Sequence, residues 1–166
     1  MNLYLLRHGI AVVRGSGGLH DEERPLTREG IEKMTAAAHS FPALIGKIDR
    51  ILTSPLVRAK ETAMIAAKEF HAVKKVQIVN ELTPGTAIDR LYALLNDHRA
   101  EGNVMLVGHE PDLSMLASAL IGAGSSAVEL KKGALCAISV NGTVAHGTGT
   151  LLFLFQPKHL RGLGLK

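Results

Sequence analysis

Short apolar runs that end in polar residues recur along the first two thirds of the chain. Four of them have the length of a buried strand: Asn2–Leu6, Arg50–Thr53, Val76–Val79 and Val104–Val107. After each run, apolar side chains return every three or four residues, which is the spacing of one helix face. These positions are Ile31, Met34, Ala38 and Phe41, then Ala59, Ala63, Ile65, Ala66 and Phe70, then Leu91, Leu94 and Leu95, and finally Leu113, Leu116, Ala117 and Leu120. A strand followed by a helix, four times over, predicts an α/β domain with a largely parallel sheet.

The last third of the chain departs from this alternation. Leu135–Val140 and the residues from Thr143 onward have the pattern of two strands, and Asn141-Gly142 between them is typical of a two-residue hairpin turn. Such a hairpin adds an antiparallel edge to the sheet. The sequence therefore predicts one domain over residues 1–166, a three-layer α/β/α sandwich with a mixed, mainly parallel sheet of about six strands.

Two polar residues stand where helices are expected to begin. Thr27 can cap a helix that starts at Arg28, and Ser54 is followed by Pro55, which suits a cap residue before a proline at the first helical position. For Thr27 and Ser54 we therefore favour capping over contact with a ligand.

Composition narrows the classes of partner. The net charge of +4 would suit an acidic partner, but the basic residues are scattered and aromatic residues make up only 4% of the chain, so no nucleic acid is expected. No apolar stretch approaches the roughly 20 residues that span a bilayer, and the first segment lacks the charge order of a signal peptide. The chain has a single cysteine, Cys136, which is expected to be a small buried side chain. The protein is expected to be cytoplasmic and to make no contact with a membrane. The histidines lack the paired spacing of a zinc site, so no metal or other cofactor is expected.

Candidate chemistry lies directly after the predicted strands, where open α/β sheets bind their ligands. The first strand runs into Arg7, His8 and Gly9, the second leads to Arg58, and the fourth runs into His109. Because the carboxyl ends of parallel strands meet at one edge of the sheet, we expect both arginines and both histidines to line one pocket.

These four residues match the demands of phosphoryl transfer, which needs donors for three charged oxygens and an attacking atom in line. The guanidinium groups of Arg7 and Arg58 suit the oxygens, and Arg58 lies near a helix start that also favours an anion. His8 can attack phosphorus if one ring nitrogen is unprotonated and the other donates to a fixed acceptor. Without a side chain, Gly9 lets the backbone either come close to the phosphoryl group or supply that acceptor. His109 would then be a second donor to the phosphoryl oxygens.

The segments around these residues resemble those of a known family. Leu6–Gly9 reads Leu-Arg-His-Gly, Thr53–Ala63 reads Thr-Ser-Pro-Leu-x-Arg-Ala-x-x-Thr-Ala, and Val107–Pro111 reads Val-Gly-His-x-Pro. Together they resemble the histidine phosphatase superfamily, which implies a phosphoglycerate mutase-like fold. The resemblance assigns the phosphate pocket to an Arg, a nucleophilic His, a second Arg and a second His, which fall on Arg7, His8, Arg58 and His109.

Two further segments resemble one subgroup of that family. Arg24–Thr27 with Gly30, and Glu81–Pro84, are similar to the small SixA-type phosphohistidine phosphatases, and the similarity runs from residue 3 to about residue 120. The chain departs from many relatives at Ile10, where they carry an acid. Larger relatives protonate the leaving group from an acidic residue beyond the third strand, and Glu81 is the candidate for that role here.

The loop between Gly9 and Thr27 supplies further candidates. Arg14, His20 and Arg24 lie on or beside it, and Arg24 is the best candidate for substrate contact. The glycines of residues 15–18 indicate a flexible loop rather than a phosphate-binding loop, because the required lysine is missing. The acidic run Asp21–Glu23 is expected to be solvated.

The sequence thus predicts a phosphatase that transfers the phosphoryl group to His8 and then to water. Phosphohistidine on a signalling protein is the favoured substrate, because imidazole is expelled more easily than an alkoxide and no large lid is expected. One alternative is a broad phosphatase or mutase for small phosphomonoesters, with Glu81 as the acid. Another is an inactive module that only binds phosphorylated proteins.

Overall fold

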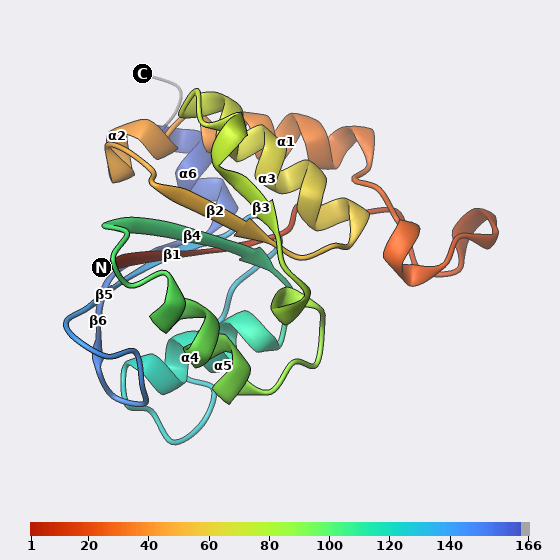
Figure 1. The fold of residues 1–166 in the computed structure, drawn as a ribbon. Helices are drawn as coiled ribbons and strands as arrows, with labels where there is room; N and C mark the ends of the chain where they lie inside the picture. Colours follow the sequence, from red (N-terminus) through yellow and green to blue (C-terminus); the bar gives the residue numbers. More distant parts are fainter. Residues whose placement is uncertain (164–166) are drawn as a thin grey trace.

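A computed structural model of the chain describes residues 1–163. Within them, six strands form one sheet in the order β3-β2-β4-β1-β5-β6 (Figure 1). The first four in this order are parallel, whereas β5 is antiparallel to β1 and β6 is antiparallel to β5. The mixed, mainly parallel sheet is therefore confirmed. The strands are β1 (Asn2–Arg7), β2 (Arg50–Thr53), β3 (Val76–Ile78), β4 (Asn103–Gly108), β5 (Leu135–Val140) and β6 (Gly149–Phe155).

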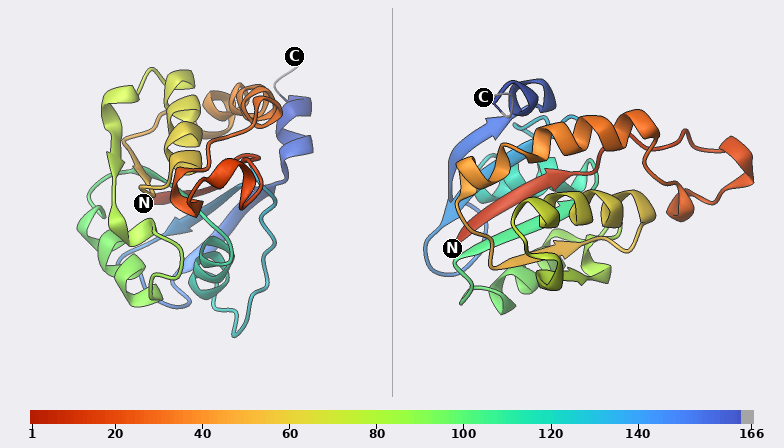
Figure 2. Two further views of the ribbon diagram at one scale, coloured as in Figure 1. Left: turned by 90° about the vertical axis from the view of Figure 1, so that its right-hand side faces the viewer. Right: turned by 90° about the horizontal axis from the view of Figure 1, so that it is seen from above.

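Helices cover both faces of this sheet (Figures 1 and 2). One face carries α1 (Arg28–Ala38), α2 (Phe41–Ile45), α3 (Val57–Glu69) and α6 (Pro157–Leu163). The other face carries α4 (Ile88–Asp97) and α5 (Asp112–Leu120). The three layers agree with the predicted sandwich. None of the helices in residues 1–163 combines the length and the apolar character needed to cross a bilayer.

Alternation along the central strands explains the two apolar cores. In β1, Leu3 and Leu5 point to the α4 and α5 side, whereas Tyr4 and Leu6 point to the α1 and α3 side. Successive strand residues face opposite sides, so a strand covered by helices on both faces must be apolar at nearly every position. This is why the central strands appear in the sequence as continuous apolar runs.

The first helix is shorter than its apolar spacing suggested. Its stripe was expected to run from Ile31 through Phe41, but α1 ends at Ala38, Phe41 opens the separate helix α2, and Ile31 is 44% exposed. Pro42 explains the break, because a proline is tolerated in the first turn of a helix but not in its interior. The predicted cap at Thr27 is confirmed, since its hydroxyl oxygen accepts from the backbone N–H of Gly30 at 2.9 Å.

The tail differs more from the prediction. The two-residue turn was wrong, because residues 141–148 form a wider connection and β6 starts at Gly149 instead of Thr143. The side chain of Asn96 on α4 pairs with both backbone groups of Val144, which is itself buried, and this draws the connection away from the strand ends. Helix α6 was not predicted at all.

Residues 12–25, here called the flap, project from the body beyond the carboxyl end of β1 (Figures 1 and 2). A single antiparallel bridge between Ala11 and Leu26 closes the base of the flap. Two short 3-10 turns shape it, η1 (Ser16–Gly18) and η2 (Asp21–Glu23). The base is fixed by α1, because Gly30 packs so closely on Ile10 that an added Cβ would lie 2.0 Å from the Ile10 carbonyl oxygen.

Candidate active site

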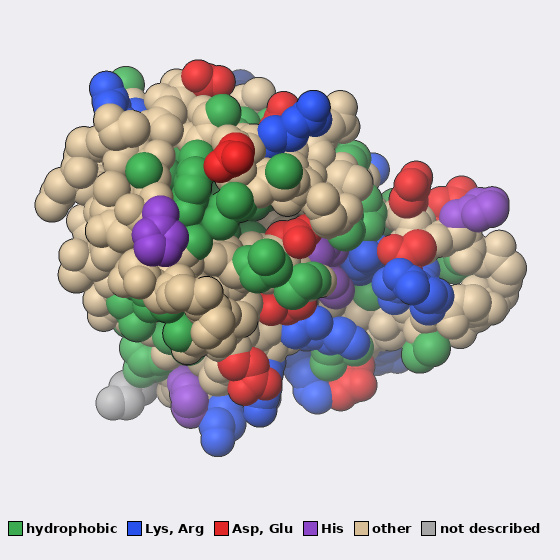
Figure 3. Space-filling view, turned by 90° about the horizontal axis from the view of Figure 1, so that it is seen from below, with side chains coloured by type: hydrophobic (Ala, Val, Ile, Leu, Met, Phe, Trp, Pro, Cys, Tyr) green, Lys and Arg blue, Asp and Glu red, His purple; other side chains and the backbone are tan. Residues whose placement is uncertain are grey.

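The structure brings the two predicted arginines and two predicted histidines to one open pocket. The parallel register pairs Arg7 with Gly108, so His8 and His109 are the next residues on neighbouring strands, and their ring centroids lie 5.1 Å apart. Arg58 reaches the same point from the first turn of α3. Seen from below, basic and acidic side chains surround histidine at the base of the flap (Figure 3). The remaining lining residues are Ala11, Arg14, Asp21, Arg24, Pro84, Glu110 and Lys132.

The ring of His8 is held in one orientation and one tautomer. Its Nδ1 lies 2.7 Å from the carbonyl oxygen of Gly9, which can only accept, so Nδ1 carries the hydrogen. Its Nε2 is left with a lone pair, and Nε of Arg58 donates to it at 3.3 Å. Burial lowers the pKa of His8 to about 3, with smaller contributions from the charges of His109 and Arg58, against the hydrogen bond to Gly9. His8 is therefore neutral at pH 7, which suits a nitrogen nucleophile.

Helix α3 holds the backbone beside His8. The hydroxyl oxygen of Thr62 accepts from the N–H of Gly9 at 3.1 Å and donates to the carbonyl of Arg58 at 2.7 Å. The backbone of His8 itself is fixed on both sides, by Gly108 on β4 and by Gly133. The suggestion that Gly9 supplies the acceptor for His8 agrees with this geometry.

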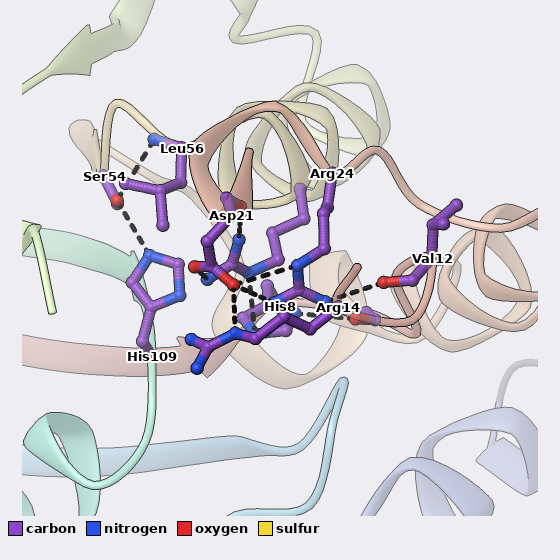
Figure 4. A network of polar contacts seen from close by, with 10 residues as sticks. His8, Val12, Arg14, Asp21, Arg24, Ser54, Leu56 and His109 are labelled. Carbon is purple, nitrogen blue, oxygen red and sulfur yellow. Dashed lines mark hydrogen bonds and ion pairs between the residues drawn. The ribbon is translucent and has the colours of Figure 1, made fainter. Parts of the chain in front are cut away.

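His109 is oriented by Ser54. Its Nε2 lies 2.8 Å from the Ser54 hydroxyl oxygen, which also accepts from the backbone N–H of Leu56 at 3.3 Å. The hydroxyl can donate its proton to Nε2, and in that tautomer the ring hydrogen of neutral His109 lies on Nδ1, which faces the His8 side (Figure 4). That Nδ1 is buried and has no partner among residues 1–163. Burial, followed by the charge of Arg58, lowers the pKa of His109 to about 4.

The expectation for Ser54 is corrected by this contact. Helix α3 begins at Val57, and no side chain caps its first turn. Ser54 is too far upstream to act as the cap, and its hydroxyl lies at the junction of the second strand and the pocket instead. It therefore belongs to the site.

The two arginines present different edges to the pocket. Arg7 donates from Nη1 to the carbonyl of Leu130 at 2.7 Å, while its Nε is buried without a partner among the described residues. Arg58, only 4% exposed, donates from Nη1 to the backbone carbonyl of Asp21 and from Nη2 to the Asp21 carboxylate. Its Nε edge faces His8.

Asp21 was expected to be solvated, and its side chain is still 31% exposed, but it also forms ion pairs that the sequence did not predict. The flap turns its carboxylate into the pocket, where Oδ1 accepts from Arg14 and Arg24 and Oδ2 accepts from Arg58 (Figure 4). Burial acts to raise the pKa of Asp21, but the hydrogen bonds from Arg14 and Arg24 and the charge of Arg58 outweigh it and hold the pKa well below its usual range. The attraction of three guanidinium groups explains why this carboxylate turns toward the pocket. Its neighbours Glu22 and Glu23 are exposed, as expected.

The other candidates lie as follows. Arg24 lines the pocket, but its guanidinium is occupied by Asp21 and by the carbonyl of Val12. Glu81 lies on the turn η4 (Asn80–Leu82) and is not among the described residues that line the pocket. Ile10 lies on the opposite side of the backbone, where it lines a separate cavity between α1 and α6. Besides Asp21, the acidic residue that lines the pocket is Glu110.

Cys136 lies in β5 and is fully buried, in agreement with the expected small apolar role. Burial raises the pKa of its thiol to about 12. The thiol is therefore protonated at neutral pH and is no nucleophile.

Comparison with known proteins gives the family. A model of the histidine phosphatase superfamily (branch 1) matches residues 3–85. The chain belongs to this superfamily. The match includes Arg7, His8 and Arg58, and it ends before His109, which the fold brings to the same pocket.

Curated relatives and solved structures bear out the resemblance to the SixA-type subgroup. An uncharacterized protein of Picosynechococcus sp. is 34% identical over 96% of this chain and 99% of the relative. The phosphohistidine phosphatase SixA of Escherichia coli is 24% identical over 97% of each chain. A structure of the protein histidine phosphatase SixA complexed with tungstate superposes with a TM-score of 0.84 at 23% identity, covering 96% of this chain and 99% of that one. A putative α-ribazole-5′-P phosphatase structure from E. coli gives 0.74 at 24% identity, covering 95% and 97%.

Proposed function

We propose that this member of the superfamily is a protein-phosphohistidine phosphatase that works through a covalent intermediate on His8. The observation that carries the proposal is the state of the His8 ring, which is neutral, has its Nδ1 hydrogen bound to Gly9 and directs the Nε2 lone pair into a pocket of cations. A nitrogen in this state can attack phosphorus without first losing a proton.

The reaction takes two steps. Nε2 of His8 forms a bond to phosphorus while the bond from phosphorus to the substrate nitrogen breaks, and the bonding electrons leave with that nitrogen. A water oxygen then bonds to phosphorus, the bond to Nε2 breaks, its electrons return to the ring, and inorganic phosphate leaves. The phosphoryl group stays in one place while the leaving group and water exchange on its far side.

Three N–H groups are available for the three equatorial oxygens. They come from Nε of Arg7, Nε of Arg58 and Nδ1 of His109, and the first and last of these have no protein partner among residues 1–163. Buried donors without partners cost free energy, so they are retained where a ligand uses them. All three belong to residues that line the pocket with His8, which supports the binding of a tetrahedral anion there.

Phosphohistidine is favoured as substrate for two reasons. Imidazole leaves as a neutral ring when its other nitrogen is protonated, so the first step makes little demand on an acid. The pocket is open toward solvent, and such a pocket can admit a side chain that projects from another protein. The names of the SixA relatives agree with this choice.

The test is hydrolysis of a purified protein phosphorylated on histidine, run beside a panel of small phosphomonoesters. We expect faster release of phosphate from the histidine-phosphorylated protein, and an acid-labile phosphoenzyme in rapid-quench samples. His8→Ala should abolish turnover and phosphoenzyme, while Cys136→Ala should retain both. Higher kcat/KM on small phosphomonoesters would favour the alternative of a metabolite phosphatase. Phosphate binding without hydrolysis of any substrate would favour the inactive module.

A further inference from the structure

Glu110 places a carboxyl group beside the pocket, and the resemblance to the family gives this residue no role. It directly follows His109 beyond the end of β4, and it lines the same pocket as Arg7, His8 and Arg58. One carboxyl oxygen, Oε2, accepts from the hydroxyl of Ser114 on α5. The other, Oε1, is buried and has no partner among residues 1–163.

The surroundings of Glu110 are those of a proton-carrying group rather than of a structural ion pair. Within the described part of the chain, no lysine, arginine or histidine lies within salt-bridge distance of its carboxyl group. A buried carboxylate without a partner is costly, so burial disfavours the ionised form. Burial raises the pKa of Glu110, although the Ser114 hydroxyl and the charge of Arg7 oppose the shift. The charged groups around it are Arg7 on β1, Asp112 on α5, and Glu129 and Lys132 on the segment before β5.

The unpartnered atoms of the site form a consistent set. Four buried side-chain polar atoms in residues 1–163 have no partner, and three of them belong to residues that line this pocket: Nε of Arg7, Nδ1 of His109 and Oε1 of Glu110. The first two are donors suited to phosphoryl oxygens, as argued above. Oε1 differs, because a carboxyl oxygen would repel a phosphoryl oxygen unless it carried a proton. It therefore suits the group on the other side of phosphorus, where the leaving atom departs and water enters.

We propose that Glu110 is the proton-transfer residue of this site. In the first step its carboxyl proton passes to the departing atom of the substrate as the bond from that atom to phosphorus breaks, which leaves Glu110 as a carboxylate. In the second step the carboxylate takes a proton from water as the water oxygen bonds to phosphorus and the bond to Nε2 of His8 breaks. The cycle thus restores the carboxyl group. This inference rests on the proposed chemistry at His8 and replaces Glu81 in the role of acid.

The experiment compares Glu110→Gln with the unaltered protein on three substrates whose leaving groups need a proton to different degrees. These are an alkyl phosphate such as phosphoserine, p-nitrophenyl phosphate, and a peptide bearing phosphohistidine. The alkoxide cannot leave without a proton, whereas p-nitrophenolate and protonated imidazole can. We expect kcat/KM to fall about 100-fold or more on the alkyl phosphate and only a few-fold on the other two. The acid-labile phosphoenzyme should build up in Glu110→Gln, because its hydrolysis also slows.

Matched variants separate proton transfer from a loss of charge or of folding. Glu129→Gln removes a negative charge that Arg7 also feels, and Glu81→Gln removes the competing candidate; both should leave the three rates in their original ratio. Glu110→Asp retains the proton and should recover part of the alkyl phosphate activity. The role of Glu110 would be overturned if Glu110→Gln lost activity equally on all three substrates or lost none. It would also be overturned if the unaltered protein had no activity on the alkyl phosphate. The phosphomonoester arms remain informative even if phosphohistidine proves not to be a substrate.

Discussion

The neutral state of the two pocket histidines should make the stability of the protein depend on pH. Both His8 and His109 are at least 93% buried, and their pKa values lie at about 3 and about 4 in the folded protein, against an ordinary 6.5. The unfolded chain therefore binds more protons than the folded chain below pH 6.5. Stability must fall as the pH falls through the window from 6.5 to about 4.

The size of the effect follows from these shifts. One pKa unit corresponds to about 1.4 kcal/mol. At pH 5.5, one unit below its ordinary pKa, protonation stabilises a histidine of the unfolded chain by about 1.4 kcal/mol, whereas the two buried rings of the folded protein stay neutral. Between pH 7.5 and 5.5, each ring should thus lower the free energy of unfolding by about 1.4 kcal/mol, and the pair by about 3 kcal/mol. This range keeps most carboxyl groups of the unfolded chain ionised.

Urea unfolding at pH 7.5 and pH 5.5 tests the reasoning. His8→Asn and His109→Asn should each reduce the loss of stability between the two pH values by about 1.4 kcal/mol, and the double variant by about 3 kcal/mol. His159→Asn, which removes an exposed histidine on α6, is the matched control and should keep the full loss. Equal pH dependence in the unaltered protein and the double variant would refute the claim that these rings are held neutral.

Two further substitutions test how the backbone beside His8 is held. Thr62→Val removes the acceptor for the Gly9 N–H, so it should lower the free energy of unfolding in urea by about 1–3 kcal/mol and also lower kcat. Thr62→Ser should restore both. Unchanged stability and kcat in Thr62→Val would show that this hydrogen bond does not hold the backbone beside His8. Gly30→Ala would bring a Cβ to 2.0 Å from the Ile10 carbonyl and should destabilise the protein by about 1–3 kcal/mol, while Gly162→Ala, with open space around it, should not; equal unfolding midpoints for the two variants would disprove the close contact.

The parts of the fold that the sequence predicted are those where burial leaves few choices. The central strands are apolar because helices cover both of their faces, and the long helices show one apolar stripe each. Helix α6 has only Leu160 fully buried, which is too short a stripe to detect. The connection over residues 141–148 depends on Asn96, which lies more than 40 positions away, so no local turn pattern could reveal it.

The candidate site likewise has residues that the sequence predicted and residues that it did not. Arg7, His8 and His109 were predicted because they end or directly follow strands whose ends must meet. The role of Ser54 was predicted wrongly, because a serine followed by a proline also fits a helix start. Only its contact with His109 shows that the hydroxyl orients this ring instead. Glu110 was not predicted as the acid, because the resemblance places that residue beyond the third strand, although the position of Glu110 next to His109 is a usable signal.

Asp21 is the residue that explains how Arg58 serves the pocket. Its backbone carbonyl and its carboxylate accept from both terminal nitrogens of Arg58, which fixes the guanidinium plane and leaves the Nε edge for His8. Without that carboxylate, Arg14, Arg24 and Arg58 would repel one another across the mouth of the pocket. In the sequence Asp21 looks like its exposed neighbours, and only its spacing of three residues from Arg24 sets it apart. The flap therefore positions the donor that faces the proposed nucleophile, and its acidic residue lines the pocket proposed to bind phosphate.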